Sequence, residues 1–199
     1  PLSGQIMPIK DNRKSIVTIV HDDGDLSTVR FMNSEFEETE LKATIAMIAK
    51  NVNTSNKAAW QACLDTGRFN IANHSYNHTY WGQTDEAESG IINGNAFSIP
   101  AGTMTKEIVS SGDHLRTMFP NEKVRCFVKP GFLYPTGLKQ VSDTAKAMIK
   151  ENYIAMRNTG GMYLGATGLN SITPDDYYNL HSLMVSYNDT VSSWKALTD

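Results

Sequence analysis

The stretch SIVTIVHDDGD, residues 15–25, joins a run of apolar and β-branched residues to three acidic residues around a glycine. The run predicts a short strand at residues 16–20 that is buried on both faces. Asp22 and Asp23 follow this strand directly. Two adjacent carboxylates at the end of a buried strand raise the question of what chemistry that end performs.

Similar runs recur along the chain and alternate with helical patterns. The β-rich runs stand at residues 16–20, 43–48, 69–72, 124–128 and 153–156. Between the second and third runs, Trp60, Cys63 and Leu64 share one face of a predicted helix. A second helical pattern covers residues 138–149. This alternation over 199 residues predicts a single α/β domain built on a parallel sheet or barrel.

The overall charge gives no sign of a polyanionic partner. With a formal net charge of -3 and a pI near 6.0, the chain lacks the basic surface that binds nucleic acids or acidic membranes. Its longest apolar stretch, residues 43–49, is far too short to span a bilayer. We therefore expect neither a nucleic-acid partner nor a membrane span. Cys63 and Cys126 are either free thiols or a disulfide, and the sequence leaves both open.

Polar side chains follow three of the predicted strands. The first strand ends in HDDGD, the third in NHSYNH and the fourth in KPGFLYP. Because the carboxyl ends of parallel strands meet at one edge of a sheet or barrel, we expect these three loops to converge. Their convergence is the strongest indication of a functional site in the chain.

A metal site is the chemistry that these loops suggest. His74 and His78 are four residues apart, so both imidazoles share one face if HSYNH opens a helix. Two histidines and one carboxylate leave positions open for water, as catalytic metal sites do. Either Asp22 or Asp23 can supply that carboxylate, and the other can accept a proton from the attacking water.

Each of these signals has an ordinary explanation when it stands alone. Paired aspartates are common in turns and at helix starts, as TPDDYY at residues 173–178 illustrates. An isolated H-x-x-x-H is more often structural or exposed than metal-binding. Their occurrence together at successive strand ends is what favours a metal site.

The motifs and their order resemble those of the polysaccharide deacetylases of carbohydrate esterase family 4, also called the NodB-homology domain. The family's first motif, typically T-F-D-D-G, resembles VHDDG at residues 20–24, with His21 in place of the aromatic residue. The second motif, H-[ST]-x-x-H, is matched by His74, Ser75 and His78. The resemblance covers roughly residues 10–160.

This resemblance implies an α/β fold of the irregular (β/α)-barrel type, TIM-like but with seven strands. The chain ends at Asp199, within a segment that resembles the helix before the family's last strand. We therefore expect a single deacetylase-like domain over residues 1–199 that is truncated before that strand. In the family the last strand carries a general-acid histidine, and the surroundings of His181 do not resemble it.

The resemblance also implies roles for the site residues. Asp22 is the implied general base, and Asp23, His74 and His78 are the implied ligands of Zn²⁺ or of another divalent ion such as Co²⁺, Ni²⁺ or Mn²⁺. The implied reaction hydrolyses N-acetyl groups on an amino-sugar polysaccharide or oligosaccharide and releases acetate. The implied location is extracytoplasmic, either periplasmic, on the cell surface or secreted.

The third motif departs from the family pattern, which is R-x-P followed by an aromatic residue. FVKPGF keeps Pro130, and the N–H of Gly131 is the implied oxyanion donor, but Val128 stands where the arginine is expected. Lys129 and Arg157 are the candidates for the missing positive charge. In the alternative, Lys129 is solvated and Arg157 makes an ordinary surface pair.

Further candidates for substrate binding flank the predicted site. They are Trp81, Pro130, Phe132, Tyr134 and Arg157. The aromatic residues among them can instead belong to the core. Two other functions stay open: a related metal amidohydrolase acting on a small non-sugar amide, and a glycan-binding domain that has lost catalysis.

Overall fold

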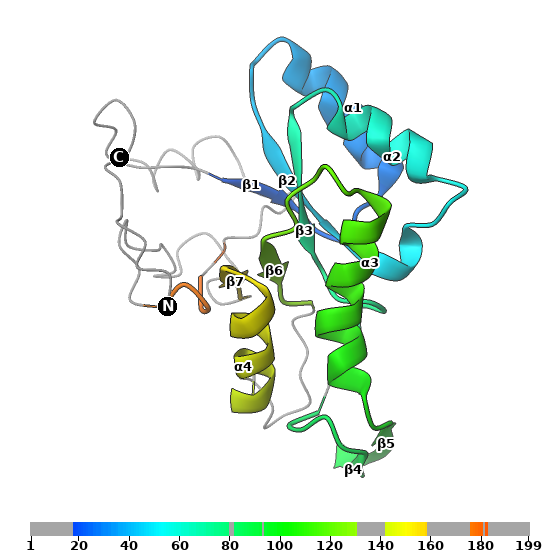
Figure 1. Ribbon diagram of the computed structural model, residues 1–199, viewed down its shortest axis with the longest axis vertical. Helices are drawn as coiled ribbons and strands as arrows, with labels where there is room; N and C mark the ends of the chain where they lie inside the picture. Colours follow the sequence, from blue (N-terminus) through cyan, green and yellow to red (C-terminus); the bar gives the residue numbers. More distant parts are fainter. Residues whose placement is uncertain are drawn as a thin grey trace.

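The computed structural model describes residues 18–79, 82–92, 94–130, 142–158, 176–180 and 182. These residues form a five-stranded parallel sheet, helices packed against it, and a separate two-stranded hairpin (Figure 1). The strand order in the sheet is β1-β2-β3-β6-β7. The strands are β1 (Ile19–His21), β2 (Ala43–Met47), β3 (Phe69–Asn73), β6 (Cys126–Val128) and β7 (Ala155–Arg157).

Helices connect the parallel strands, as a parallel sheet requires. They are α1 (Leu26–Glu37), α2 (Lys57–Leu64), α3 (Ser111–Met118) and α4 (Asp143–Asn152). A 3-10 turn at Ala49–Asn51 follows β2, and a π-helix at Thr105–Ser110 runs directly into α3. The five strands predicted from the sequence are therefore present within a few residues of their expected positions.

The sheet curls into a partial barrel. β1 and β7 are the edge strands of the sheet. Even so, Asp22 just after β1 forms an ion pair with Arg157 at the end of β7. Leu180 forms a parallel bridge to Arg157, so the sheet continues beyond β7. The predicted α/β fold of the irregular (β/α)-barrel type is confirmed, and the count of seven strands stays a prediction.

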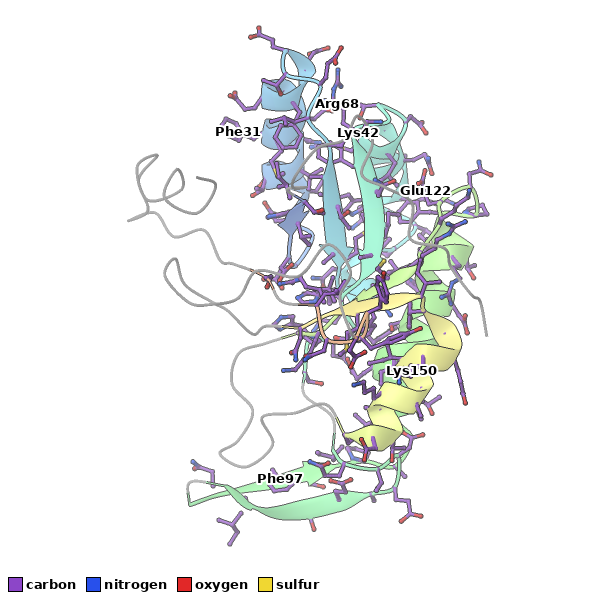
Figure 2. All side chains as sticks on the ribbon, turned by 90° about the vertical axis from the view of Figure 1, so that its left-hand side faces the viewer. Phe31, Lys42, Arg68, Phe97, Glu122 and Lys150 are labelled. Atoms are coloured by element: carbon purple, nitrogen blue, oxygen red, sulfur yellow. The ribbon has the colours of Figure 1, made fainter. Side chains whose placement is uncertain are left out.

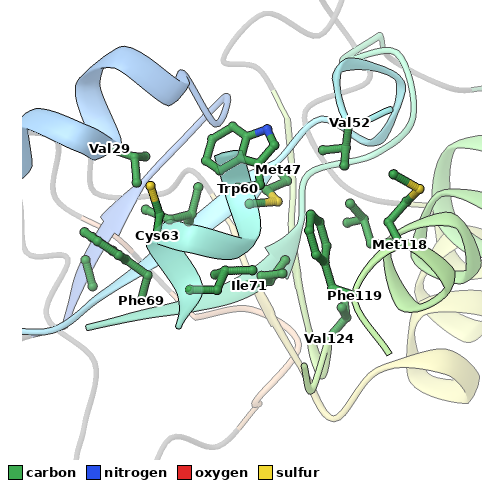
Figure 3. Close-up of a cluster of buried hydrophobic side chains, with 14 of the residues drawn as sticks. Val29, Met47, Val52, Trp60, Cys63, Phe69, Ile71, Met118, Phe119 and Val124 are labelled. Carbon is green, nitrogen blue, oxygen red and sulfur yellow. The ribbon is translucent and has the colours of Figure 1, made fainter. Parts of the chain in front are cut away.

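Hydrophobic side chains pack the helices against the sheet. In the largest cluster, Trp60 of α2, Phe69 of β3 and Phe119 after α3 are at most 3% exposed (Figure 3). Burying one such side chain stabilises the fold by about 1.5–3 kcal/mol. A second cluster packs Phe127 of β6 against Ile149 of α4 and the π-helix. Both clusters fix the strands whose carboxyl ends carry the polar loops.

A hairpin absent from the sequence prediction separates β3 from the π-helix. Its strands, β4 (Glu88–Ile92) and β5 (Asn95–Ile99), are antiparallel. Phe97 on this hairpin and Phe31 on α1 lie at opposite ends of the molecule (Figure 2). Asp85, just before β4, accepts hydrogen bonds from the N–H and hydroxyl of Thr105. The insertion is therefore tied to the start of the π-helix.

The two cysteines do not form a disulfide. Cys63 is buried and Cys126 is half-buried, and both are free thiols. Among the helices in the described ranges, none is both long enough and apolar enough to cross a membrane.

Candidate active site

The loop after β1 turns sharply within four residues. Asp23 and Gly24 adopt φ values of +70° and +62°, in the left-handed region. A Cβ at Gly24 would lie 3.3 Å from the Cα of Met47, so glycine suits both the conformation and the space. The Asp25 carboxylate then accepts hydrogen bonds from the first turn of α1 as its N-cap. The turn thus separates the directions of Asp22 and Asp23.

The two histidines lie in an irregular loop, so the condition that HSYNH opens a helix is not met. His74 directly follows β3, and Ser75 and His78 have φ values of +66° and +59°, which an α-helix does not contain. The N–H of His78 donates to Ser75 Oγ at 3.0 Å. The two N–H groups before it donate to the carboxylate of Glu107. Side chains, rather than carbonyls one turn earlier, therefore satisfy this backbone.

A hydrogen bond fixes the orientation of His74. The ring is 1% exposed, and its Nδ1 lies 2.8 Å from the carbonyl oxygen of Val128. Because a carbonyl oxygen only accepts hydrogen bonds, Nδ1 carries the proton, and Nε2 of the neutral ring presents a lone pair. A histidine that donates one ring N–H to a backbone carbonyl is oriented as metal-binding histidines are.

Asp23, His74 and His78 converge on one point. Asp23 Oδ1 lies 3.4 Å from His74 Nε2 and 3.3 Å from His78 Nε2. The ligand atoms of the three residues all lie within 4.8 Å of one another. Two ligands that are each about 2.0–2.1 Å from a tetrahedral zinc ion are about 3.3–3.4 Å apart. The spacing of Asp23 from each histidine therefore fits a divalent ion.

Charge at this point favours a cation. The lone pair on His74 Nε2 faces a carboxylate oxygen, an arrangement that repels unless a proton or a metal ion lies between the atoms. With a proton there, the hydrogen bond from His74 holds the pKa of Asp23 below its usual range, although desolvation opposes this shift. Positive charge on His74, His78 or His21 would lower this pKa as well. Donor chemistry and spacing together make these three residues a fit for a metal ion.

Asp22 contacts an arginine instead of the histidines. Arg157 Nη2 donates to Asp22 Oδ2, and Arg157 Nη1 donates to Ser182 Oγ at 2.8 Å. Arg157 is the register partner of Val128 on the neighbouring strand, so both side chains start from the same face of the sheet. The positive charge missing at position 128 is thus supplied from β7. The alternative of an ordinary surface pair does not hold, because the Arg157 side chain is only 16% exposed.

One oxygen of Asp22 is left without a partner. Its Oδ1 is a buried atom that accepts no hydrogen bond within the described part of the chain. Oδ2 is already held by Arg157. A carboxylate that is fixed through one oxygen and unpaired at the other keeps an acceptor for a proton.

Lys129, the other candidate for the positive charge, does not match its predicted environment. Its side chain is 2% exposed, so the alternative of a solvated lysine is wrong. Burial lowers the pKa of Lys129 to about 8. Pro130, which follows it, is also buried.

Several predicted site residues lie outside the described residues. They are Trp81, Gly131, Phe132, Tyr134 and His181. The predictions for the oxyanion donor, the aromatic substrate contacts and the general acid therefore stay predictions. The structure does bring together Asp22, Asp23, His74, His78 and Arg157.

Sequence reasoning missed two acidic residues beside the site. Asp25 could have been recognised as a helix N-cap, because serine and threonine follow it at the start of a helical pattern. Glu107 carries no such signal, since a glutamate in a helical segment is usually exposed. Only the fold reveals that it is buried against the histidine loop.

The fold and these strand-end loops define a class of protein: partial (β/α) barrels with aspartates and histidines gathered at the carboxyl ends of their strands. Within that class, residues 9–151 match the family described as Polysaccharide deacetylase. The chain belongs to this family. A comparison with curated proteins gives no match.

Solved structures of deacetylases share the fold. A polysaccharide deacetylase from Bacillus cereus is 16% identical with a TM-score of 0.63, over 95% of this chain and 53% of that chain. A de-N-acetylase from Aggregatibacter actinomycetemcomitans is 14% identical with a TM-score of 0.65, over 94% and 76%. A Streptococcus pyogenes deacetylase in complex with acetate is 16% identical with a TM-score of 0.66, over 94% and 72%. This chain spans about half the length of the Bacillus protein.

Proposed function

We propose that this protein hydrolyses N-acetyl groups on an amino-sugar polysaccharide or oligosaccharide and releases acetate. The observation that carries the proposal is the convergence of Asp23, His74 and His78 on one point, beside an Asp22 carboxylate that Arg157 holds by one oxygen. Membership of the polysaccharide deacetylase family supports the choice of a glycan substrate. The extracytoplasmic location stays a prediction.

The proposed chemistry divides the work between the two adjacent acids. Asp23, together with His74 and His78, would hold a divalent ion, for which Zn²⁺ is our first candidate. When bound, such an ion supplies a Lewis acid that polarises the acetyl carbonyl and acidifies water. Asp22 accepts the proton of the attacking water at its unpaired Oδ1, while Arg157 fixes the carboxylate through Oδ2. The C–N bond then breaks, the nitrogen takes up the proton that left the water, and acetate and a free amine remain.

The Arg157 contact also bears on the alternative of a binding domain without catalysis. One reason for that alternative was the missing arginine of the third motif. Because Arg157 reaches Asp22 from the neighbouring strand, the proposed base keeps a cationic partner. The family's histidine that protonates the leaving amine has no counterpart among the described residues. The assay below therefore decides whether the protein has lost catalysis for want of that histidine.

Acetate release from N-acetylglucosamine oligomers tests the proposal. The zinc-loaded protein would be assayed on the oligomers and, in parallel, on a simple N-acetyl alkylamine. We expect acetate from the oligomers and much less from the small amide. His74→Ala should abolish release, whereas the control His114→Gln should retain it, because His114 contacts the carbonyl of Val52 and the ring of Tyr76 and is not one of the three proposed ligands.

Three results would contradict the proposal in different ways. Faster release from the small amide would favour a non-sugar amidohydrolase. Binding of the oligomers without acetate release would favour a glycan-binding domain. Release that survives both His74→Ala and chelation of the metal would exclude the proposed site.

A further inference from the structure

Glu107 is a buried carboxylate that the proposed chemistry does not use. It lies on the π-helix Thr105–Ser110 and is 1% exposed. Its Oε2 accepts the backbone N–H groups of Tyr76 and Asn77 at 3.0 and 2.8 Å. Its Oε1 accepts the Asn77 side-chain amide at 2.7 Å. All three donors belong to the loop between the two histidines of the proposed metal site.

The burial of the Glu107 carboxylate requires interactions that stabilise its charge. A buried charge is costly unless it is paired or hydrogen-bonded. No ion pair to Glu107 occurs within the residues that the structure describes, so the three N–H donors stabilise it. Hydrogen bonds to an ionised acceptor are stronger than neutral ones. The contact between Glu107 and the loop is therefore a strong one.

The loop depends on such contacts because its backbone is strained. Ser75 and His78 both adopt positive φ values, which cost a non-glycine residue about 1–2 kcal/mol each. Ser75 Oγ accepts the N–H of His78, and Glu107 accepts the two N–H groups just before it. These bonds hold the conformation in which His78 Nε2 lies 3.3 Å from Asp23.

The π-helix fixes Glu107 relative to the other histidine. Its Ile108 carbonyl accepts hydrogen bonds from Asn73 Nδ2 at 3.2 Å and from the Tyr153 hydroxyl at 2.6 Å. Asn73 is the last residue of β3 and directly precedes His74. π-Helical segments are often found at functional sites. The π-helix here connects Glu107 with the end of β3 through the hydrogen bond from Asn73 to the Ile108 carbonyl.

We propose that Glu107 is a positioning residue for the metal site: it holds the His74–His78 loop so that His78 reaches the ion already bound by Asp23 and His74. This inference rests on the proposed function, because it presumes that the three residues bind a metal. Glu107 is not one of the three residues that converge on the proposed ion site. Its effect should therefore appear in metal affinity more than in the stability of the fold.

A reciprocal exchange of groups between Glu107 and Asn77 tests the proposal. Glu107→Gln removes the charge and replaces Oε1 by an amide nitrogen, so the Asn77 amide has to turn its oxygen toward it and the backbone N–H groups keep only a neutral acceptor. Asn77→Asp places a second carboxylate against Glu107. In the double variant, the carboxylate introduced at position 77 can accept from the new amide at position 107. The remaining oxygen of that amide still accepts the two backbone N–H groups.

Zinc affinity would be measured by titration against a competing chelator, with thermal unfolding in EDTA as the measure of stability. We expect each single variant to bind zinc about 10- to 100-fold more weakly, as loss of a partner outside the ligand set usually does. The double variant should recover most of the affinity. Glu88→Gln is the matched control, because Glu88 also accepts two backbone N–H groups of a loop but lies on β4, outside the histidine loop.

The outcomes separate this inference from the proposed function. Wild-type zinc affinity in folded Glu107→Gln overturns the positioning role and leaves the proposed function standing. A lower unfolding temperature in EDTA with unchanged zinc affinity makes Glu107 purely structural and also overturns it. If Glu107→Gln does not fold, failure of the double variant to restore zinc binding overturns the inference. No zinc on the wild-type chain contradicts both proposals at once.

Discussion

At the scale of single residues, Asp22 and Asp23 are sequence neighbours with different partners. Asp23 faces the two histidines, and Asp22 faces Arg157. The positive φ of Asp23 explains the difference, because it turns the chain between the two side chains. In an extended strand, neighbouring side chains also point to opposite sides. The positive φ of Asp23 adds the turn after which its carboxylate lies beside His78.

This division of partners predicts different effects of substitution. We expect Asp22→Asn to keep zinc and to lower the rate of acetate release by about 10²-fold or more, because an amide is a poor proton acceptor. Zinc content by elemental analysis and acetate release would be measured on the same sample. Asp25→Asn is the control in the same loop, since asparagine caps a helix as well as aspartate does. Undiminished release by Asp22→Asn would exclude Asp22 as the base.

Lys129 predicts a pH dependence of stability. Burial lowers its pKa from 10.5 to about 8, so between these values the unfolded chain binds more protons than the folded chain. The free energy of unfolding should therefore rise with pH, by about 1–2 kcal/mol between about pH 8 and 9.5. Urea unfolding at a series of pH values checks this. Lys129→Met should remove the rise, and an unchanged rise in that variant would assign it to another group.

At the scale of secondary-structure elements, β7 supplies the positive charge that β6 lacks at Val128. Arg157→Met should leave zinc affinity unchanged and lower kcat/KM for the oligomers by about 10-fold or more, because the Asp22 carboxylate loses its charged partner. Since Val128 and Arg157 are register partners, Val128→Arg in the Arg157→Met background should restore part of the loss. Steady-state kinetics of the three proteins measures this. Full activity of Arg157→Met alone would mean that the ion pair does not assist Asp22.

Local patterns predicted all five strands of the parallel sheet because each is a short apolar run that needs no distant partner to be recognised. The hairpin β4–β5 could have been predicted as well, since Asn93 and Gly94 form an NG turn signal between two β-prone runs. The condition of a helix through His74 and His78 is not met for a different reason. Spacing alone could not reveal that Glu107, about 30 residues later, takes the N–H groups a helix would use.

The sequence likewise predicted the site residues that lie close together in the chain, but not the contacts between distant ones. The motifs identified Asp22, Asp23 and the two histidines, because each pair lies close together in the sequence. The choice between Lys129 and Arg157 could not be made from the sequence, since Arg157 is 135 residues from Asp22 and reaches it only through the order of the strands. Burial of Lys129 likewise depends on the packing of the whole sheet.

At the scale of the whole molecule, the proposed metal site joins distant parts of the barrel. Asp23 follows β1 and His74 follows β3, with β2 between these strands. The Asp22–Arg157 pair joins the loop after β1 to β7, on the other edge of the sheet. An ion held by Asp23 and the histidines would add a link that the unfolded chain cannot make.

Zinc should therefore raise the unfolding temperature. At a free zinc concentration about 100 times the Kd, binding to the folded state alone adds about 2.7 kcal/mol. For a chain of this size, that corresponds to a rise of roughly 5–10 °C. Thermal unfolding followed by circular dichroism, with zinc and with EDTA, measures the difference.

The Asp23→Ala variant decides whether the rise comes from this site. Asp23 is the ligand that connects the β1 loop to the histidines, and its side chain is 61% exposed, so its removal should disturb packing little. We expect Asp23→Ala to unfold near the wild-type temperature in EDTA and to gain almost nothing from zinc. An equal gain in the variant would place the zinc elsewhere, because Asp23 is the one member of the proposed ligand set that lies on the β1 loop and ties it to β3.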